Sequence, residues 1–243
     1  GHNCVASGCT IDMTTTGNTA DKNIPVQILG FHHDRIADSD EKAYVTFGTV
    51  NLINKQEYAW TGESEGYIHN TYYRIQNVLN NIYEEIDNDI LKNAIVVNIE
   101  KDTVQVKGSL WTGEYRTDVS KENFEVTTSR DNKLFLFSGV ELTGGYFRDL
   151  NGVCVKKERS YFQYENFAGE GEQYEYYRQF GSNLDTSSFA DHFIKTRNGE
   201  PGLWWLRGAC AEFDDVATQM DGYMTQTGTT GDTAGLCFGF CLN

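Results

Sequence analysis

The most regular hydrophobic pattern in the chain lies between residues 66 and 92. Apolar side chains recur there every three or four residues, which is the spacing that places them on one face of an α-helix. Asn, Arg and Glu residues fill the positions between them, as expected for a face in contact with water. The apolar positions are Tyr72, Ile75, Leu79, Ile82, Ile86 and Ile90. The pattern predicts one long amphipathic helix over about residues 66–92, packed on a sheet by its apolar face.

Most other apolar runs are rich in β-branched and aromatic residues, which favour strands. The predicted strands include Ile24–Phe31, 43–53, 133–142 and 236–242. Residues 95–111 predict a β-hairpin, with Glu-Lys-Asp at 100–102 as its tight connection. We therefore expect a strand-rich α+β fold, in which a mainly antiparallel sheet is covered by the single long helix.

The first 23 residues differ from the rest of the chain because they are small and polar, with few side chains to bury. No linker rich in Pro, Gly or Ser divides the residues that follow. We expect a cysteine-bearing N-terminal arm over residues 1–23 and a single α+β domain over residues 24–243. The domain is predicted to end in a short terminal strand.

The cysteines suggest an oxidising environment. Their number is even, most lie towards the two ends of the chain, and no Cys-x-x-Cys motif is present. The six are Cys4, Cys9, Cys154, Cys210, Cys237 and Cys241. This pattern predicts three disulfides that staple the termini, with the pairing left open, and an extracellular or cell-surface location. The alternative is a set of buried free thiols in a cytosolic protein.

The charge of the chain excludes some partners. The formal net charge is −15 at pH 7, and no basic run offsets it locally. A chain of this charge is repelled by nucleic acid and by anionic membrane surfaces. The longest apolar runs also fall short of the roughly 18 residues that a membrane span requires. We expect neither nucleic-acid binding nor membrane insertion.

Two groups of residues are candidates for metal binding. His32 and His33 could hold a transition metal if His69 or His192 supplied a third ligand, but a surface histidine pair is the preferred interpretation. Two acidic stretches could supply oxygen ligands to Ca²⁺, although neither matches the EF-hand pattern. These stretches contain Asp34, Asp38, Asp40 and Glu41, and Asp214, Asp215 and Asp221. We assign no metal site, and Ca²⁺ is the one candidate cofactor.

The tyrosine-rich segment 161–177 is the candidate for glycosidase-like chemistry, because carboxylates beside aromatic rings can bind or hydrolyse sugars. Its carboxylates are Glu165, Glu170, Glu172 and Glu175. An acidic, solvated face is the preferred interpretation. The sequence contains no nucleophile elbow and no phosphate-binding loop. We assign no catalytic residue, and whether the protein is an enzyme stays open, with a non-enzyme favoured.

These features together favour a secreted or cell-surface structural or interaction protein, such as a filament subunit or an adhesin. Its partner would be another copy of itself or another extracellular protein, and assembly would use a terminal segment donated to a neighbour's sheet. The competing arrangement, in which both termini pair with their own domain, is the preferred one.

The alternative function is carbohydrate recognition, either by a binding module or by a carbohydrate-active enzyme that uses surface aromatics and carboxylates. The candidate ligand-binding aromatics are Trp60, Trp111, Trp204 and Trp205. Tryptophans are more often core residues than ligand platforms, which places this function second.

Overall fold

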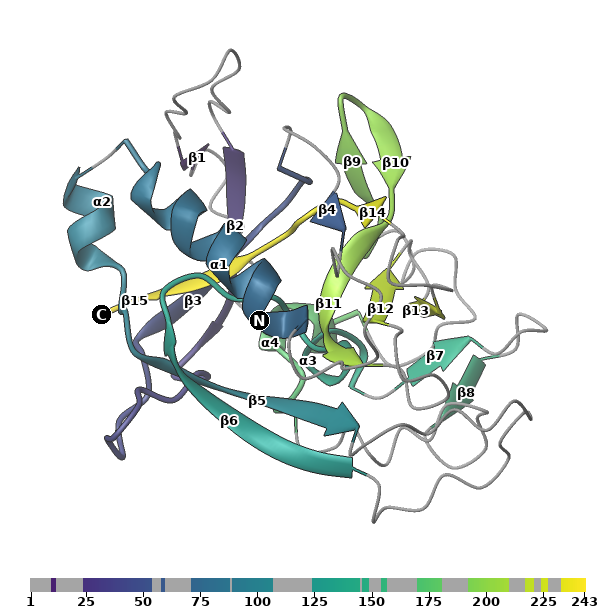
Figure 1. Cartoon of the computed structure of the whole chain (residues 1–243), viewed down its shortest axis with the longest axis horizontal. Helices are drawn as coiled ribbons and strands as arrows, with labels where there is room; N and C mark the ends of the chain where they lie inside the picture. Colours follow the sequence, from purple (N-terminus) through teal and green to yellow (C-terminus); the bar gives the residue numbers. More distant parts are fainter. Residues whose placement is uncertain are drawn as a thin grey trace.

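The structure is a computed structural model that describes residues 10–11, 24–53, 58–59, 71–87, 89–106, 124–144, 146–148, 154–156, 170–180, 192–209, 217–220, 224–226 and 233–243 (Figure 1). The helices are α1 (Thr71–Glu84), α2 (Asp89–Ala94), α3 (Gly139–Thr143) and α4 (Glu175–Arg178). The first strands are β1 (Thr10–Ile11), β2 (Ile24–Phe31), β3 (Val45–Thr49), β4 (Tyr58–Ala59), β5 (Ile99–Val106), β6 (Phe124–Asn132), β7 (Tyr146–Arg148) and β8 (Cys154–Lys156). The remaining strands are β9 (Lys195–Arg197), β10 (Glu200–Gly202), β11 (Trp204–Ala209), β12 (Ala217–Met220), β13 (Met224–Gln226), β14 (Thr233–Ala234) and β15 (Gly239–Leu242).

The largest sheet joins segments from both ends of the chain. Its order is β1-β2-β3-β15, and every pair is antiparallel. The predicted strand at Ile24–Phe31 is confirmed residue for residue as β2. The terminal strand β15 pairs with β3 on one side, and on its other side Gly239 exchanges backbone hydrogen bonds of 2.8 and 3.0 Å with Phe135. Both terminal segments described, β1 and β15, therefore pair within their own chain.

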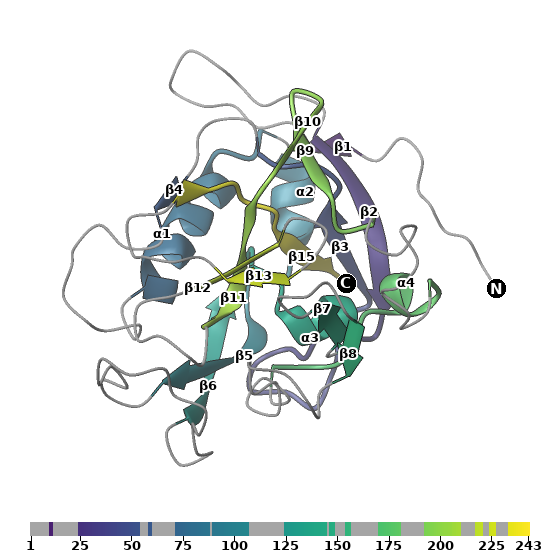
Figure 2. The same ribbon diagram turned by 90° about the vertical axis from the view of Figure 1, so that its right-hand side faces the viewer.

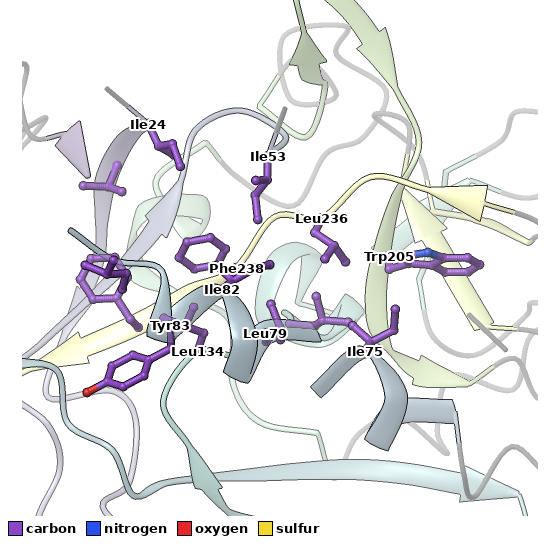
Figure 3. Packing of buried hydrophobic residues seen from close by; sticks show 14 of the residues in the cluster. Ile24, Ile53, Ile75, Leu79, Ile82, Tyr83, Leu134, Trp205, Leu236 and Phe238 are labelled. Atoms are coloured by element: carbon purple, nitrogen blue, oxygen red, sulfur yellow. The ribbon is translucent and has the colours of Figure 1, made fainter. Parts of the chain in front are cut away.

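Two apolar cores lie on opposite faces of the same extended segments. Along the C-terminal segment, Leu236 and Phe238 belong to the core beneath α1, whereas Cys237 belongs to the other core. Residues 134–137 alternate in the same way, because successive side chains of an extended chain point to opposite faces. Figure 3 shows Leu236 and Phe238 facing Leu79 of α1. These segments are buried on both sides, which explains their nearly continuous apolar sequence.

The prediction of one long helix is wrong, because the structure has two short ones over that range. Helix α1 ends at Glu84 and α2 starts at Asp89, and the two point in different directions in Figure 1. The apolar face is buried only as far as Ile86, whereas Ile90 is 84% exposed. Asp and Asn residues at 87–89 favour this break, because their side chains compete for backbone hydrogen bonds and prefer helix starts.

The side chain of Lys92 holds the break in place. Its ammonium donates to the backbone oxygen of Glu84 at 3.0 Å and to the Glu84 carboxylate at 2.8 Å. In one continuous helix these two residues would be separated by about 12 Å along the axis. Tyr83 adds a hydrogen bond from its hydroxyl to the Lys92 carbonyl at 3.1 Å. Because α2 folds back towards α1, a carbonyl group in the last turn of α1 accepts a hydrogen bond from a side chain of α2.

The prediction of disulfide-stapled termini is also wrong for the part of the chain that the structure describes. Cys237 and Cys241 are buried free thiols, each occupying a small apolar position in the second core. The Cys241 sulfur lies 3.4 Å from the Thr46 hydroxyl. Cys4, Cys9 and Cys210 lie outside the described residues, and for Cys154 only the backbone is described, in β8.

The expected turn at residues 100–102 is a third correction. These residues lie inside β5, which runs from Ile99 to Val106 and pairs with β6 instead of folding back on itself (Figure 2). The charged run resembles a turn in sequence, but every second residue of it points into the protein.

None of the described helices is long and apolar enough to cross a membrane.

Candidate functional site

Four charged side chains meet in the interior of the protein and form what we call the ion cluster. Asp34 comes from the β2–β3 connection, Lys101 from β5, Glu141 from α3 and Arg207 from β11. Each is at most 5% exposed. Burial of charge is costly unless every charge is paired and hydrogen bonded, so the contacts within this cluster decide whether it is tolerated.

Lys101 occupies the centre of the ion cluster. Its ammonium donates to Asp34 Oδ1 at 2.5 Å, to Glu141 Oε1 at 2.7 Å and to the Tyr174 hydroxyl at 2.9 Å. An ammonium has three N–H groups, and these three acceptors use all of them. The strand period explains the inward direction: Ile99, Lys101 and Thr103 are buried, and the residues between them face outward.

Arg207 completes the other side of the cluster. Its Nη1 donates to Glu141 Oε2 at 3.0 Å and to the Leu136 carbonyl at 2.6 Å. Its Nη2 donates to the Glu170 carbonyl at 2.9 Å, and its Nε donates to the Asp102 carbonyl at 2.9 Å. One guanidinium therefore ties β11 to β5, to α3 and to the segment that begins at residue 170.

Helix α3 places Glu141 through a capping box. The Ser138 hydroxyl accepts a hydrogen bond from the Glu141 backbone N–H at 3.1 Å, and the Ser138 N–H donates to Glu141 Oε2 at 2.9 Å. The same carboxylate thus caps a helix and binds two cations. The pattern Ser-x-x-Glu at 138–141 is a recognised sign of a helix start. The strand predicted over 133–142 is therefore wrong from Gly139 onward, where α3 begins.

The electrostatics of the cluster keep both acids ionised. Burial alone raises the pKa of Asp34, but the Lys101 ammonium and His33 more than reverse this and hold it below its ordinary value. Burial also raises the pKa of Glu141, but the Arg207 guanidinium and the Lys101 ammonium hold it below its ordinary value. The pKa of Tyr174 is raised by burial and by the Asp34 charge, so its hydroxyl stays protonated.

A pocket of about 280 Å³ lies over the ion cluster. Asp34, Lys101 and Glu141 form its buried floor, and more exposed polar side chains form its rim. All lining residues are polar or Gly: His33, Asp34, Arg35, Lys42, Glu100, Lys101, Asp102, Glu141, Glu170, Gly171 and Glu172. Such a lining, with both donors and acceptors, suits recognition of a polar or charged group.

His33 joins the two walls of this pocket. Its ring lies 4.2 Å from the Tyr174 ring, and its Nε2 lies 3.1 Å from the Glu172 carbonyl. A carbonyl can only accept, so Nε2 carries a proton and donates it. Nδ1 lies 3.5 Å from Asp34 Oδ1. These contacts hold the segment 170–174 against the β2–β3 connection.

Neither of the two described tryptophans that were predicted to bind ligand lines this pocket. Trp204 and Trp205 are fully buried, and neither presents its ring to solvent in this structure. The Trp204 indole N–H donates to the Phe193 carbonyl at 3.1 Å, as expected of a core tryptophan. Trp60 and Trp111 lie outside the described residues.

The candidate metal ligands that the structure describes are dispersed or already engaged. His32 is exposed and His192 stacks on Phe180 at 3.4 Å, while Asp34 is held by Lys101 and Asp38 pairs with Arg130. Among the residues that the structure describes, no group of three or more His, Cys, Asp and Glu side chains is arranged to hold a metal ion. His69, Asp214, Asp215 and Asp221 fall outside those residues.

Two of the four carboxylates from the tyrosine-rich segment do reach the pocket. Glu170 and Glu172 line it, whereas Glu175 lies in α4 with an exposed side chain and Glu165 is outside the described residues. Four residues at or beneath the pocket were not among the predicted site residues: Lys101, Glu141, Arg207 and Tyr174. Only the capping box and the outward–inward alternation of β5 carried a signal for them.

Comparison with protein-family models, with curated proteins and with solved structures found no match to this chain.

Proposed function

We propose that this protein is an interaction protein that acts without covalent turnover, and that the pocket over the ion cluster is its recognition site. The observation that carries the proposal is the hydrogen-bonded ion cluster, three of whose members, Asp34, Lys101 and Glu141, form the pocket floor. A buried ion network contributes little net stability compared with apolar packing of the same volume. Its position beneath a polar pocket therefore supports a role in recognition.

The protonation states favour binding over acid–base catalysis. A general acid in glycoside hydrolysis needs a raised pKa so that it still carries a proton near neutral pH. Asp34 and Glu141 have lowered pKa values instead, and both stay ionised. All three protons of Lys101 are already donated, which removes it as a nucleophile. Fixed charges of this kind suit a binding surface.

The extracellular or cell-surface location and the partner stay predictions. The location relied on six paired cysteines, and two of them are free thiols in this structure. Self-association through a donated strand would need β1 or β15 to leave its own sheet. We therefore base the proposed interaction on the pocket and not on the terminal segments.

Carbohydrate binding is the second candidate function, and one surface feature favours it. Phe31 and Tyr44 are 42% and 56% exposed, and their rings lie edge to face at 5.8 Å. Exposed rings of this kind can stack on the apolar faces of sugars. They flank His33 and Lys42 in the sequence, and these two residues line the pocket.

The test is a thermal-shift screen of small polar molecules and short peptides on three proteins. These are the native chain, Glu172→Arg at the pocket, and Glu200→Arg on exposed β10 as a control with the same change of charge. We expect ligands that raise the melting temperature of the native and control proteins but not of the pocket variant, and that are recovered unchanged by mass spectrometry. The proposal fails if all hits stabilise both variants equally, if a hit is chemically converted, or if the screen yields none.

A further inference from the structure

We infer that the pocket takes a cationic nitrogen group, a guanidinium or an ammonium, carried on a basic side chain of a partner polypeptide. The inference rests on the proposed function of the pocket as a recognition site and names the chemistry of what it recognises. It follows from the charges that line the pocket and from the way the cations of the site are already used.

The residues that line the pocket carry more negative than positive charge. Six carboxylates line the pocket, belonging to Asp34, Glu100, Asp102, Glu141, Glu170 and Glu172. The cations that line it are Arg35, Lys42 and Lys101, and Arg207 reaches Glu141 from behind as a fourth. Within the described part of the chain, negative charge is thus in excess at the pocket. The net charge of −15 adds a field that draws cations towards the surface.

At the rim of the pocket formed by β5, the single cation Arg35 contacts two carboxylates. Arg35 Nη2 lies 3.3 Å from Glu100 Oε1 and 3.0 Å from Asp102 Oδ2. The two acids are 14% and 21% exposed, whereas the Arg35 side chain is 51% exposed. One guanidinium carries a single positive charge, so Arg35 by itself compensates only one of these two carboxylates. The contact also shows, within the chain itself, that the two acids accept a guanidinium.

The wall of the pocket formed by residues 170–174 adds the exposed carboxylate of Glu172. Its backbone is held by the hydrogen bond from His33, so its position is fixed relative to the floor. A cation that enters between this wall and β5 finds carboxylates on both sides. Charge-assisted hydrogen bonds of this type are roughly twice as strong as neutral ones.

The charged side chains of the pocket floor disfavour the binding of anions and of metal ions. An anion would meet an excess of carboxylates, and the ammonium of Lys101 has no proton left to donate. Among the residues that the structure describes, no three His, Cys, Asp or Glu side chains are placed to hold one metal ion, and Asp34 and Glu141 are already held by Lys101 and Arg207. An organic cation needs only the rim carboxylates and no rearrangement of the floor. The volume of about 280 Å³ suits a group the size of one side chain.

The test uses two capped tripeptides, Gly-Arg-Gly and its citrulline analogue, which keeps the shape of arginine but carries no charge. Binding to the native protein is measured by isothermal titration calorimetry at pH 7 and low salt. We expect the arginine peptide to bind at least about tenfold more tightly than the citrulline peptide, equal to about 1.4 kcal/mol. Its affinity should also fall as salt is raised, because salt screens an attraction between exposed charges.

Matched variants locate the binding. Glu172→Gln and Glu100→Gln each remove one rim carboxylate, and Glu200→Gln removes an exposed carboxylate outside the pocket. We expect each rim variant to weaken the arginine peptide by several-fold and the control to leave its affinity unchanged, with far-UV circular dichroism showing that all three are folded. Agmatine and a Gly-Lys-Gly peptide separate a free small cation from a peptide and a guanidinium from an ammonium.

The inference is overturned if both peptides bind equally, if neither binds at millimolar concentration, or if Glu200→Gln has the same effect as the rim variants. Its failure is distinct from failure of the proposed function. If the thermal-shift screen finds neutral or anionic ligands that require the pocket, the site is a recognition site, but not one for cations.

Discussion

The core beneath α1 and the ion cluster are buried to the same degree by opposite means. Ile75, Leu79 and Ile82 are at most 5% exposed, as are Lys101 and Glu141. Apolar side chains gain free energy from burial against any apolar neighbour, so the core needs shape but not specific partners. The charges gain nothing from burial unless each finds a partner in the right place.

This difference shows where the fold tolerates change. The α1 core can lose one methylene group at a time, with a cost that grows with the cavity left behind. The ion cluster behaves as a unit, because removal of one member leaves its partners charged and buried. The variants below distinguish the two kinds of burial.

Deletion of residues 236–243 is expected to have the largest effect, because this segment supplies both regions. Leu236 and Phe238 pack under α1, and the Cys241 thiol lies 3.6 Å from Asp34 Oδ2. We expect the truncated chain to lose its cooperative unfolding transition in urea. A truncated chain that stays folded would show that β15 is dispensable and free to pair with another molecule.

Lys101→Met is expected to destabilise the protein by about 3–5 kcal/mol, because it leaves Asp34 and Glu141 buried without their shared cation. The measurement is the urea midpoint of the variant against the native protein. Adding Glu141→Gln should then cost less than it does in the native background, since one uncompensated charge is removed. Strictly additive effects would contradict a coupled cluster.

Leu79→Ala should destabilise by about 2–5 kcal/mol, since the side chain is fully buried at the centre of the apolar face. Combined with Lys101→Met, it should give a sum within about 0.5 kcal/mol of the separate effects, because the two sites lie in different clusters. A larger departure from additivity would mean that the two regions are coupled.

Acid should weaken the ion cluster and spare the α1 core. The pKa values of Asp34 and Glu141 are lowered in the folded state, so their contribution is present above the unfolded value of about 4 and is lost as pH falls through the folded values. We expect the native protein to lose more stability between pH 6 and pH 3 than Lys101→Met does. Leu79→Ala should keep the native pH profile, and equal profiles for all three would refute the assignment.

Ile90→Ala is expected to have the smallest effect, below about 0.5 kcal/mol, because Ile90 is 84% exposed on α2. The residue belongs to the apolar pattern of the predicted long helix, so it is the control for Leu79→Ala. A cost comparable to that of Leu79→Ala would mean that α1 and α2 form one helix in solution, as the sequence pattern predicted.

The spacing of apolar residues and the composition of the chain by themselves determined part of the fold of this protein. The strand at Ile24–Phe31, the buried positions Ile75, Leu79 and Ile82, and the strand-rich antiparallel architecture follow from local apolar patterns. Such patterns are readable because apolar burial depends on the side chain and its face, not on a particular partner. The apolar spacing did not reveal the break between α1 and α2, since Ile90 continues the same spacing, and the contact of Lys92 with Glu84 is what holds the two helices apart.

The tertiary structure decided which charged side chains meet at the candidate site. Lys101 reads as a turn residue in the sequence and becomes the centre of the ion cluster because β5 pairs with β6 and turns this side chain inward. Its partners Asp34 and Glu141 are 67 and 40 positions away along the chain. The alternation of β5 and the capping box of α3 are local signals for a direction and for a helix start, but they do not name the distant partner that makes a buried charge stable.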